Sequence, residues 1–148
     1  MTAAARRVQL EPAFLLHHYP FRESSRILEL FSRAHGRVSL IARAARRGGS
    51  ALPAALQPFA EVLVSWSARG EAGQLTGAES VRPPAFLSGD RLMSGFYVNE
   101  LLIKLLPRQD PHPRLYEAYE RLIAGLQDVA CDPAGALRLF EKRLLEEL

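Results

Sequence analysis

The chain has 148 residues, of which 48% are apolar and 24% charged, and its formal net charge is +3. Such a chain is long enough to bury a sizeable core, and its composition is typical of globular proteins rather than of disordered or membrane-embedded ones. The longest apolar run, around residues 101–106, contains Lys104 and is far shorter than the roughly eighteen residues that a membrane-spanning helix requires. The single cysteine, Cys131, excludes an internal disulfide and a multi-thiolate zinc site within this chain, so we expect a protein of a reducing, cytoplasmic compartment.

Basic side chains are concentrated in the first fifty residues. Nine arginines stand there against three glutamates, which gives a charge of +6, whereas ten basic and thirteen acidic residues give the remainder −3. Arginine presents a planar guanidinium that matches phosphate geometry and stacks on bases better than lysine does. A basic part joined to a mildly acidic part predicts a polyanion-binding surface on the first, with nucleic acid as the leading candidate.

The first eighty residues show the pattern of short β-strands separated by turns. After a tail over residues 1–7, which we expect to be flexible, short apolar runs alternate with turns rich in Pro, Gly and polar residues. Strands are expected at residues 13–19, 37–43, 61–66 and 74–76. Residues 27–31 fit either a strand or a short helix, and we favour a strand because the turn at Gly36 lets them pair with the following run. Five strands in about seventy residues describe a small closed barrel.

Residues after about position 81 indicate helices, since Pro83-Pro84 ends the strand region. Three are expected, one capped by Ser88 or Asp90, one opened by the Asp110–Pro113 turn, and one capped by Asp132-Pro133. The third keeps its apolar period to Leu148 without a Gly or Asn cap, so either its end frays or it belongs to a longer protein, which we favour. Strands followed by helices predict an α+β arrangement.

Several short segments, in order along the chain, resemble the RecO DNA repair proteins. They are residues 13–16, 22–25, 31–42, the basic loop 43–47, and then 56–59, 64–66, 75–79, 95–102, 107–113, 139–141 and 144–145. No single segment is decisive, but this many in one order is specific. The similarity extends over nearly the whole chain.

The resemblance implies a five-stranded OB-fold β-barrel over residues 8–80 and an α-helical domain over residues 81–148, three helices of which are present and which we expect to be incomplete. RecO-type proteins are recombination mediators without enzymatic activity or a cofactor. They bind single- and double-stranded DNA, anneal strands, and help load a recombinase onto strands coated with single-strand binding protein, together with a RecR-type partner. The implied location is bacterial cytoplasm, at the nucleoid during repair. Many members carry a four-cysteine zinc module after the part that this chain matches.

The basic loop is the first predicted DNA contact. Arg43, Arg46 and Arg47 adjoin Gly48-Gly49, so we expect an arm that adapts to a DNA backbone path, the alternative being a solvated loop that only aids solubility. Further contacts are expected around the first predicted hairpin, at Arg22, Arg26, Arg33 and Arg37. We expect two or three of these four to touch phosphate and the others to pair with Glu23 or Glu29.

Trp66, with Arg69 beyond it, is placed where a base could stack, but a lone tryptophan in an apolar strand is more often core, which we favour. Phe14, Phe31 and Phe59 are expected to fill the barrel. Asn99-Glu100, a polar pair in an apolar helix, is expected to form hydrogen bonds between barrel and helices.

Metal binding and catalysis find little support. Adjacent residues of a strand face opposite sides, so His17 and His18 cannot easily share an ion, and no carboxylate or thiol cluster accompanies them or His35. Motifs of phosphate-loop, metalloprotease and serine-hydrolase enzymes are missing from the sequence. The resemblance and the basic residues together lead us to expect a DNA-binding mediator. The alternative is a protein-interaction module that docks a RecR-type partner or the acidic tail of single-strand binding protein.

Overall fold

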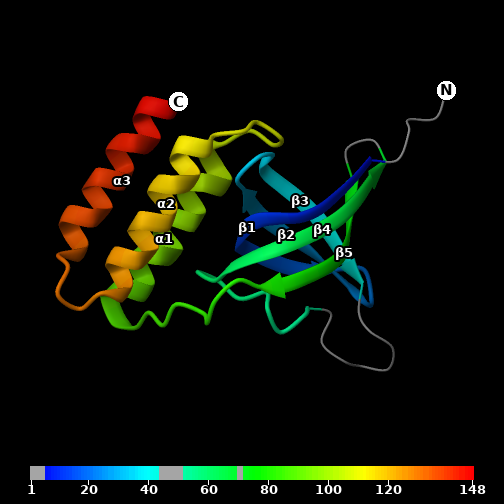
Figure 1. Cartoon of the computed structure of the whole chain (residues 1–148), viewed down its shortest axis with the longest axis horizontal. Helices are drawn as coiled ribbons and strands as arrows, with labels where there is room; N and C mark the ends of the chain where they lie inside the picture. The colour runs from blue at the N-terminus through cyan, green and yellow to red at the C-terminus, as the bar shows by residue number, and fades with distance from the viewer. Residues whose placement is uncertain (1–5, 44–51, 70–71) are drawn as a thin grey trace.

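A computed structural model describes residues 6–43, 52–69 and 72–148. In order, these residues form β1 (Arg6–Phe21), β2 (Ser25–Ser32), β3 (Gly36–Arg43), β4 (Glu61–Arg69), β5 (Ala72–Ser80), α1 (Gly89–Leu105), α2 (Pro113–Gln127) and α3 (Pro133–Glu147). The strands close into a barrel in the order β1-β2-β3-β5-β4. The barrel and the helices stand side by side, and α3 lies farthest from the barrel (Figure 1). The predicted α+β fold with a five-stranded OB-type barrel is confirmed.

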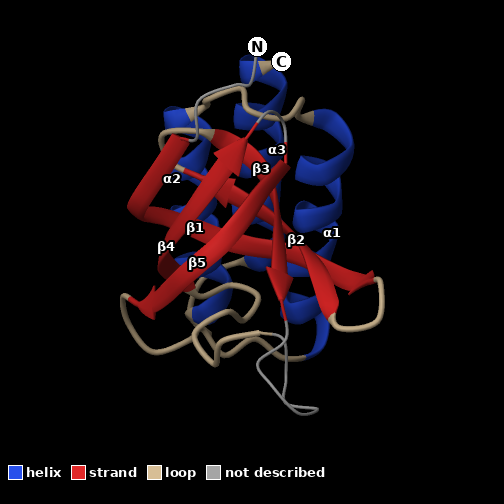
Figure 2. Ribbon diagram, turned by 90° about the vertical axis from the view of Figure 1, so that its right-hand side faces the viewer, coloured by secondary structure: helices blue, strands red, loops and turns tan. Residues whose placement is uncertain are grey.

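The long strand β1 holds the barrel together, because it pairs antiparallel with β4 along its first half and with β2 along its second. Strand β3 pairs antiparallel with β2, which confirms residues 27–31 as strand. A short parallel pairing of Leu40 and Ile41 in β3 with Gly73 and Gln74 in β5 closes the barrel. Figure 2 shows these strands crossing in front of the three helices.

The predicted flexible tail is too long by at least two residues. Arg6 and Arg7 belong to β1 and pair with Ala68 and Ser67 of β4, while residues 1–5 lie outside the described part of the chain. Strand β1 also continues beyond its expected end at residue 19, because Pro20 and Phe21 still pair with β2.

The barrel has two apolar faces. Its interior is filled by small and branched residues together with Trp66, and these include Ala13, Leu15, Leu28, Leu30, Val38, Leu40, Val62 and Val64. Successive strand residues face opposite sides, so Phe14 and Phe31 lie on the outside, where they pack with Phe59 against the helices. The expectation that these three phenylalanines fill the barrel is therefore wrong. They are buried, but at the junction between the barrel and the helical domain.

Asn99 of α1 joins the two parts of the molecule, as predicted. Its Nδ2 donates to the carbonyl of Leu16 at 3.2 Å, and its Oδ1 accepts from the Tyr119 hydroxyl at 2.6 Å. The register of β1 against β2 shifts between Leu15 and His17, so Leu16 is the extra residue of a β-bulge. Glu100, by contrast, is exposed and pairs with Lys104.

The starts of the helices are capped differently. Ser88 precedes α1, which agrees with one of the two predicted caps, but neither Ser88 nor His112 before α2 forms a side-chain cap hydrogen bond. Asp132 accepts from the backbone N–H groups of Ala134 and Gly135, which confirms the predicted cap of α3. Arg91 of α1 donates to carbonyl oxygens at the end of α2, including that of Asp128 at 2.9 Å, and so fastens the two helices together. Within the described ranges, none of these helices is both long and apolar enough to cross a bilayer.

Candidate nucleic-acid interface

Arg22 and Arg43 lie at one end of the barrel, which we call the distal end, formed by the β1–β2 turn and the end of β3. Ser25 pairs with Phe21 on one side and with Arg43 on the other, so the register brings the two segments together. Both arginines are exposed, the Arg22 guanidinium lies 5.0 Å from the Phe21 ring centre, and neither forms an ion pair with a described residue. Arg46 and Arg47, which follow in sequence, lie outside the described residues.

Arg26 is close to this end but occupies a different face of the sheet. It pairs with Ala42, a residue of the barrel interior, and its Nε donates to Nδ1 of His18 at 2.8 Å. Burial lowers the pKa of His18, and the neighbouring charges of Arg26 and His17 lower it further. A neutral imidazole can accept this hydrogen bond, so His18 orients Arg26 at the mouth of the barrel.

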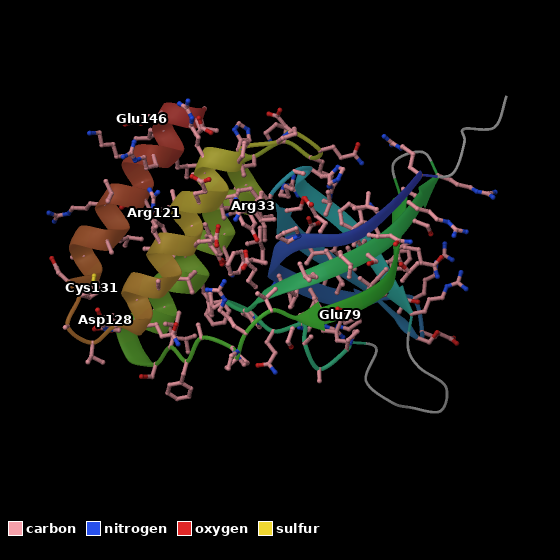
Figure 3. All side chains as sticks on the ribbon, in the orientation of Figure 1. Arg33, Glu79, Arg121, Asp128, Cys131 and Glu146 are labelled. Atoms are coloured by element: carbon pink, nitrogen blue, oxygen red, sulfur yellow. The ribbon has the colours of Figure 1, made fainter. Side chains whose placement is uncertain are left out.

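Arg33 is at the opposite end, against the helical domain (Figure 3). Its guanidinium pairs with Glu120 of α2 at 2.8 Å and lies 4.8 Å from the centre of the Tyr116 ring. Ser32, the last residue of β2 and the neighbour of Arg33, is six positions beyond Arg26, or about 20 Å at roughly 3.3 Å per residue. The four arginines of the first hairpin therefore do not form one groove.

Arg37 is buried, with 9% of its surface exposed. It donates to Glu29 at 3.0 Å and to the carbonyl of Leu106 at 2.9 Å. Glu29 is also buried, and it accepts further hydrogen bonds from Ser39 and from Arg108. The structure places Arg37 inside the junction instead of on an exposed face, which corrects the prediction that it reaches phosphate.

Trp66 lies in the barrel interior, where 6% of its surface is exposed. The core position that we favoured for Trp66 is therefore confirmed. Arg69 ends β4 in an exposed position. The pairing of β1 with β4 brings Arg6 and Arg7 beside it, and both are exposed. These three arginines form a second basic group on the barrel.

A row of three apolar side chains crosses the outer face of the barrel. Tyr19 of β1 pairs with Ile27 of β2, which pairs with Ile41 of β3, and Tyr19 is 40% exposed. The row is the floor of a cavity of about 590 Å³, which we call the β3–β5 hollow. Its other lining residues are Arg37, Ser39, Leu40, Gly73, Arg108 and Gln109.

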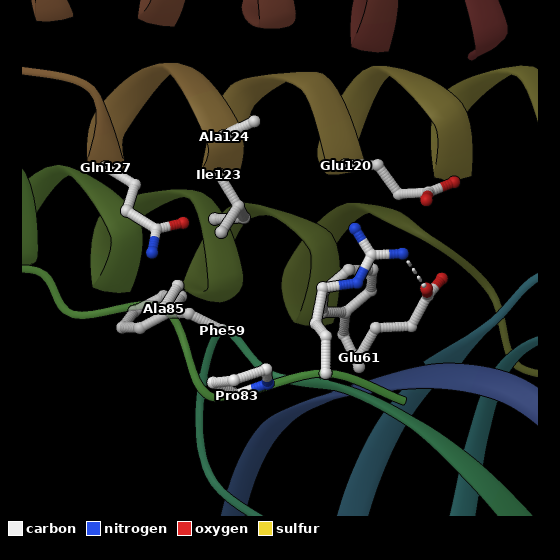
Figure 4. Close-up of a pocket in the computed structure, with 10 residues that line it drawn as sticks. Phe59, Glu61, Pro83, Ala85, Glu120, Ile123, Ala124 and Gln127 are labelled. Atoms are coloured by element: carbon white, nitrogen blue, oxygen red, sulfur yellow. Dashed lines mark hydrogen bonds and ion pairs between the residues drawn. The ribbon is translucent and has the colours of Figure 1, made fainter. Parts of the chain in front are cut away.

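The junction between barrel and α2 holds a second buried carboxylate, Glu61 (Figure 4). It accepts from the Tyr116 hydroxyl at 2.7 Å and pairs with Arg82 at 3.2 Å. Burial, then the nearby charge of Glu61, raises the pKa of Glu120. These contacts hold the barrel against the helices.

The described residues contain no group of three or more His, Cys, Asp or Glu side chains that could hold a metal ion.

The helical domain carries an apolar groove of its own, between α2 and α3. Its floor is formed by Ala118, Leu122, Ala136, Leu139 and Phe140. Arg121 and Arg143 flank it; Arg121 forms no ion pair with any described residue, and Arg143 pairs with Glu146 at 3.5 Å. Figure 3 shows Arg121 among the helices, away from the barrel.

Two family models together match almost the whole chain. Recombination protein O N terminal matches residues 8–84, and Recombination protein O C terminal matches residues 87–148. The chain belongs to the RecO family. It is 48% identical over 145 residues to the DNA repair protein RecO of Ralstonia nicotianae, with 97% of this chain and 53% of the relative covered.

Two other RecO proteins are similar to the same degree. The Cupriavidus metallidurans protein is 47% identical over 142 residues, covering 95% of this chain and 47% of the relative. The Dechloromonas aromatica protein is 45% identical over 147 residues, covering 96% and 60%. This RecO chain therefore spans about half the length of the curated relatives it matches, and its membership in a DNA repair family confirms the resemblance found in the sequence.

Sequence reasoning missed several residues of the RecO surface. Alternation along β1 could have placed Tyr19 on one face with His17, but not beside Ile41, because that requires the register of three strands. Arg108 comes from the connector between α1 and α2, 69 positions after Ser39, whose hydroxyl accepts from it at 3.0 Å. Such a contact has no local signal in the sequence.

Proposed function

We propose that this RecO chain binds single- and double-stranded DNA through phosphate contacts and serves as a recombination mediator, promoting strand annealing and recombinase loading with a RecR-type partner. The observation that carries the proposal is the exposure of Arg22 and Arg43 at the distal end, where neither forms an ion pair with a described residue. Arg43 directly precedes the segment that contains Arg46 and Arg47. Arg6, Arg7 and Arg69 extend the positive surface of the barrel.

Charge neutralisation is the mechanism that such a surface supports. Two approaching DNA strands repel each other through their phosphates, and guanidinium groups on the barrel reduce that repulsion without reading bases. No general acid, base or nucleophile is required. The action is therefore that of a non-catalytic DNA-binding protein, tolerant of sequence and sensitive to salt, working at the bacterial nucleoid during repair.

The direct test changes Arg43, Arg46 and Arg47 together to alanine. We expect the triple variant to bind a labelled single strand at least about tenfold more weakly at low salt, equivalent to roughly 1.4 kcal/mol. Its slope of log K against log salt should be shallower by about 2, since each lost phosphate contact on a single strand contributes about 0.7. Fluorescence anisotropy at several salt concentrations measures both.

The matched control removes three charges from the helical domain, by changing Arg114, Arg138 and Lys142 to alanine. All three are exposed. We expect this control to keep nearly the wild-type affinity. An equal loss in both triple variants would mean that overall charge, and not the distal end, controls binding, and a salt-independent affinity would contradict the mechanism.

A second function is favoured by the groove between α2 and α3, namely docking of the acidic tail of single-strand binding protein. An apolar floor flanked by Arg121 and Arg143 suits a peptide that offers carboxylates to the two guanidinium groups and apolar side chains to the floor. This role is compatible with DNA binding on the barrel, because Arg121 and the distal end lie on different domains (Figure 3).

Changing Arg121 and Arg143 to alanine tests the docking role. We expect binding of a labelled acidic-tail peptide to weaken at least about tenfold, or roughly 1.4 kcal/mol, because both flanking charges are lost, while DNA affinity stays nearly unchanged. The comparison variant changes Arg114 and Arg138, which do not line the groove. Peptide binding that survives the loss of Arg121 and Arg143 would argue against this groove.

A further inference from the structure

We propose that the β3–β5 hollow holds one unpaired nucleotide of a single strand, with its base stacked on Tyr19 and its flanking phosphates contacted by Arg43 and Arg108. The proposal rests on the DNA-binding function proposed above and specifies which form of DNA this surface prefers. It gives roles to Tyr19 and Arg108, neither of which was among the predicted contacts.

The floor of the hollow has the chemistry of a base-binding surface. Tyr19, Ile27 and Ile41 lie side by side on three adjacent strands, so the row is about 10 Å wide at roughly 4.8 Å between strands. The His17 ring stacks beside the Tyr19 ring, with the ring centres 6.1 Å apart and the ring planes inclined by 28°. An exposed aromatic face accepts any unpaired base, because every base has a π-face.

Two arginines, Arg43 and Arg108, flank this floor along β3, although of these two only Arg108 is among the residues that line the hollow. Arg43 is two residues beyond Ile41 on the same strand and face, or about 6.6 Å along it. On the other side, Arg108 donates to Ser39 while 60% of its side chain stays exposed. The nearby acid, Glu29, is buried and held by Arg37 and Arg108, so its charge is already compensated. The edges of the hollow therefore carry a net positive charge that favours the binding of phosphate.

The hollow is formed by both domains. The α1–α2 connector reaches the edge of β3 beyond its pairing with β5, where the backbone N–H of Gln109 donates to the carbonyl of Arg37 at 2.7 Å. Arg37 and Arg108 also form a parallel bridge. The helical domain thereby extends the sheet and places Arg108 and Gln109 in the wall of the hollow.

Unpaired DNA fits this hollow better than a duplex. In a duplex each base is covered on both faces by its neighbours and cannot lie on Tyr19 without being unstacked. A single strand offers its bases freely, so stacking adds to the phosphate contacts only for unpaired DNA. The cavity volume of about 590 Å³ lies within the range of small-ligand sites.

The test compares an ordinary single strand with an abasic strand of the same length and charge. We expect the wild-type protein to bind the ordinary strand about tenfold more tightly. In Tyr19→Ala this preference should disappear, while affinity for the abasic strand and its salt dependence stay unchanged. Tyr19→Phe should restore the preference, because the phenyl ring retains the stacking face.

Tyr97→Ala is the matched control, since Tyr97 is a tyrosine of similar exposure, 41%, on α1. It should retain the preference for the ordinary strand, and circular dichroism should show that both alanine variants are folded. If Tyr19→Ala keeps the tenfold preference, the stacking site is overturned while DNA binding stands. If the wild-type protein binds neither strand, the proposed function fails and this proposal fails with it.

Discussion

Replacing Arg37 with alanine is expected to lower the free energy of unfolding by about 3–5 kcal/mol, the cost of breaking a buried ion pair by removing one partner. Glu29 would lose its closest cation while remaining in the interior, where 4% of its surface is exposed. The carbonyl of Leu106 would lose its donor as well. Chemical denaturation followed by circular dichroism measures this change.

Two further variants distinguish the effect of breaking the buried Arg37–Glu29 ion pair from the effect of losing one positive charge. Arg108→Ala removes the other cation of Glu29, but its side chain is 60% exposed, so we expect a cost of no more than about 1 kcal/mol. The double change of Glu29 to Leu and Arg37 to Met removes both buried charges and should regain most of the stability. A stable Arg37→Ala protein with weakened DNA binding would contradict the structural role and return Arg37 to the DNA-contact set.

Gly36→Ala is expected to cost about 3 kcal/mol, through a left-handed backbone conformation together with overpacking. Gly36 has a φ of +71°, which L-residues rarely adopt. A methyl group there would also overlap the backbone carbonyl of Asp110, so the α1–α2 connector would have to move away from β3. The midpoint of thermal unfolding should fall accordingly.

Gly77→Ala in β5 is the control for this prediction. A Cβ at Gly77 meets no atom of a described residue within 4 Å, and its φ is not in the left-handed range. We expect a change of less than about 0.5 kcal/mol, because no contact is disturbed. Equal destabilisation by the two substitutions would show that the approach of the connector to Gly36 is unimportant.

Much of the architecture was predictable from local pattern. Alternation and turn residues gave the five strands, and Asp132-Pro133 gave the start of α3, because capping and strand periodicity depend on neighbouring residues. The positions of Phe14 and Arg37 were not predictable in the same way. Alternation assigns Phe14 to the face opposite Ala13, but only the docked helices make that outer face a buried one.

The candidate site was predictable only in part. The arginine bias identified the barrel as the basic part, and Arg22 and Arg43 do lie exposed at its distal end. Which arginines stay free depends on acids far away in sequence, such as Glu120 for Arg33. The combination of Tyr19 with Arg108 depends on strand register and on where the α1–α2 connector meets β3. Composition cannot encode such long-range neighbours.

The β-bulge at Leu16 lies in the contact surface between the two regions of this RecO chain that the family models match. The Leu16 carbonyl is satisfied by Asn99 from the helical side, and the same helices cover Phe14, Phe31 and Phe59. Removing the helices by a cut between the matched regions, at residues 85–86, would expose the apolar outer face of the barrel to solvent. A partner that displaces the helices would therefore also remove the donor from the Leu16 carbonyl and uncover the apolar outer face of the sheet.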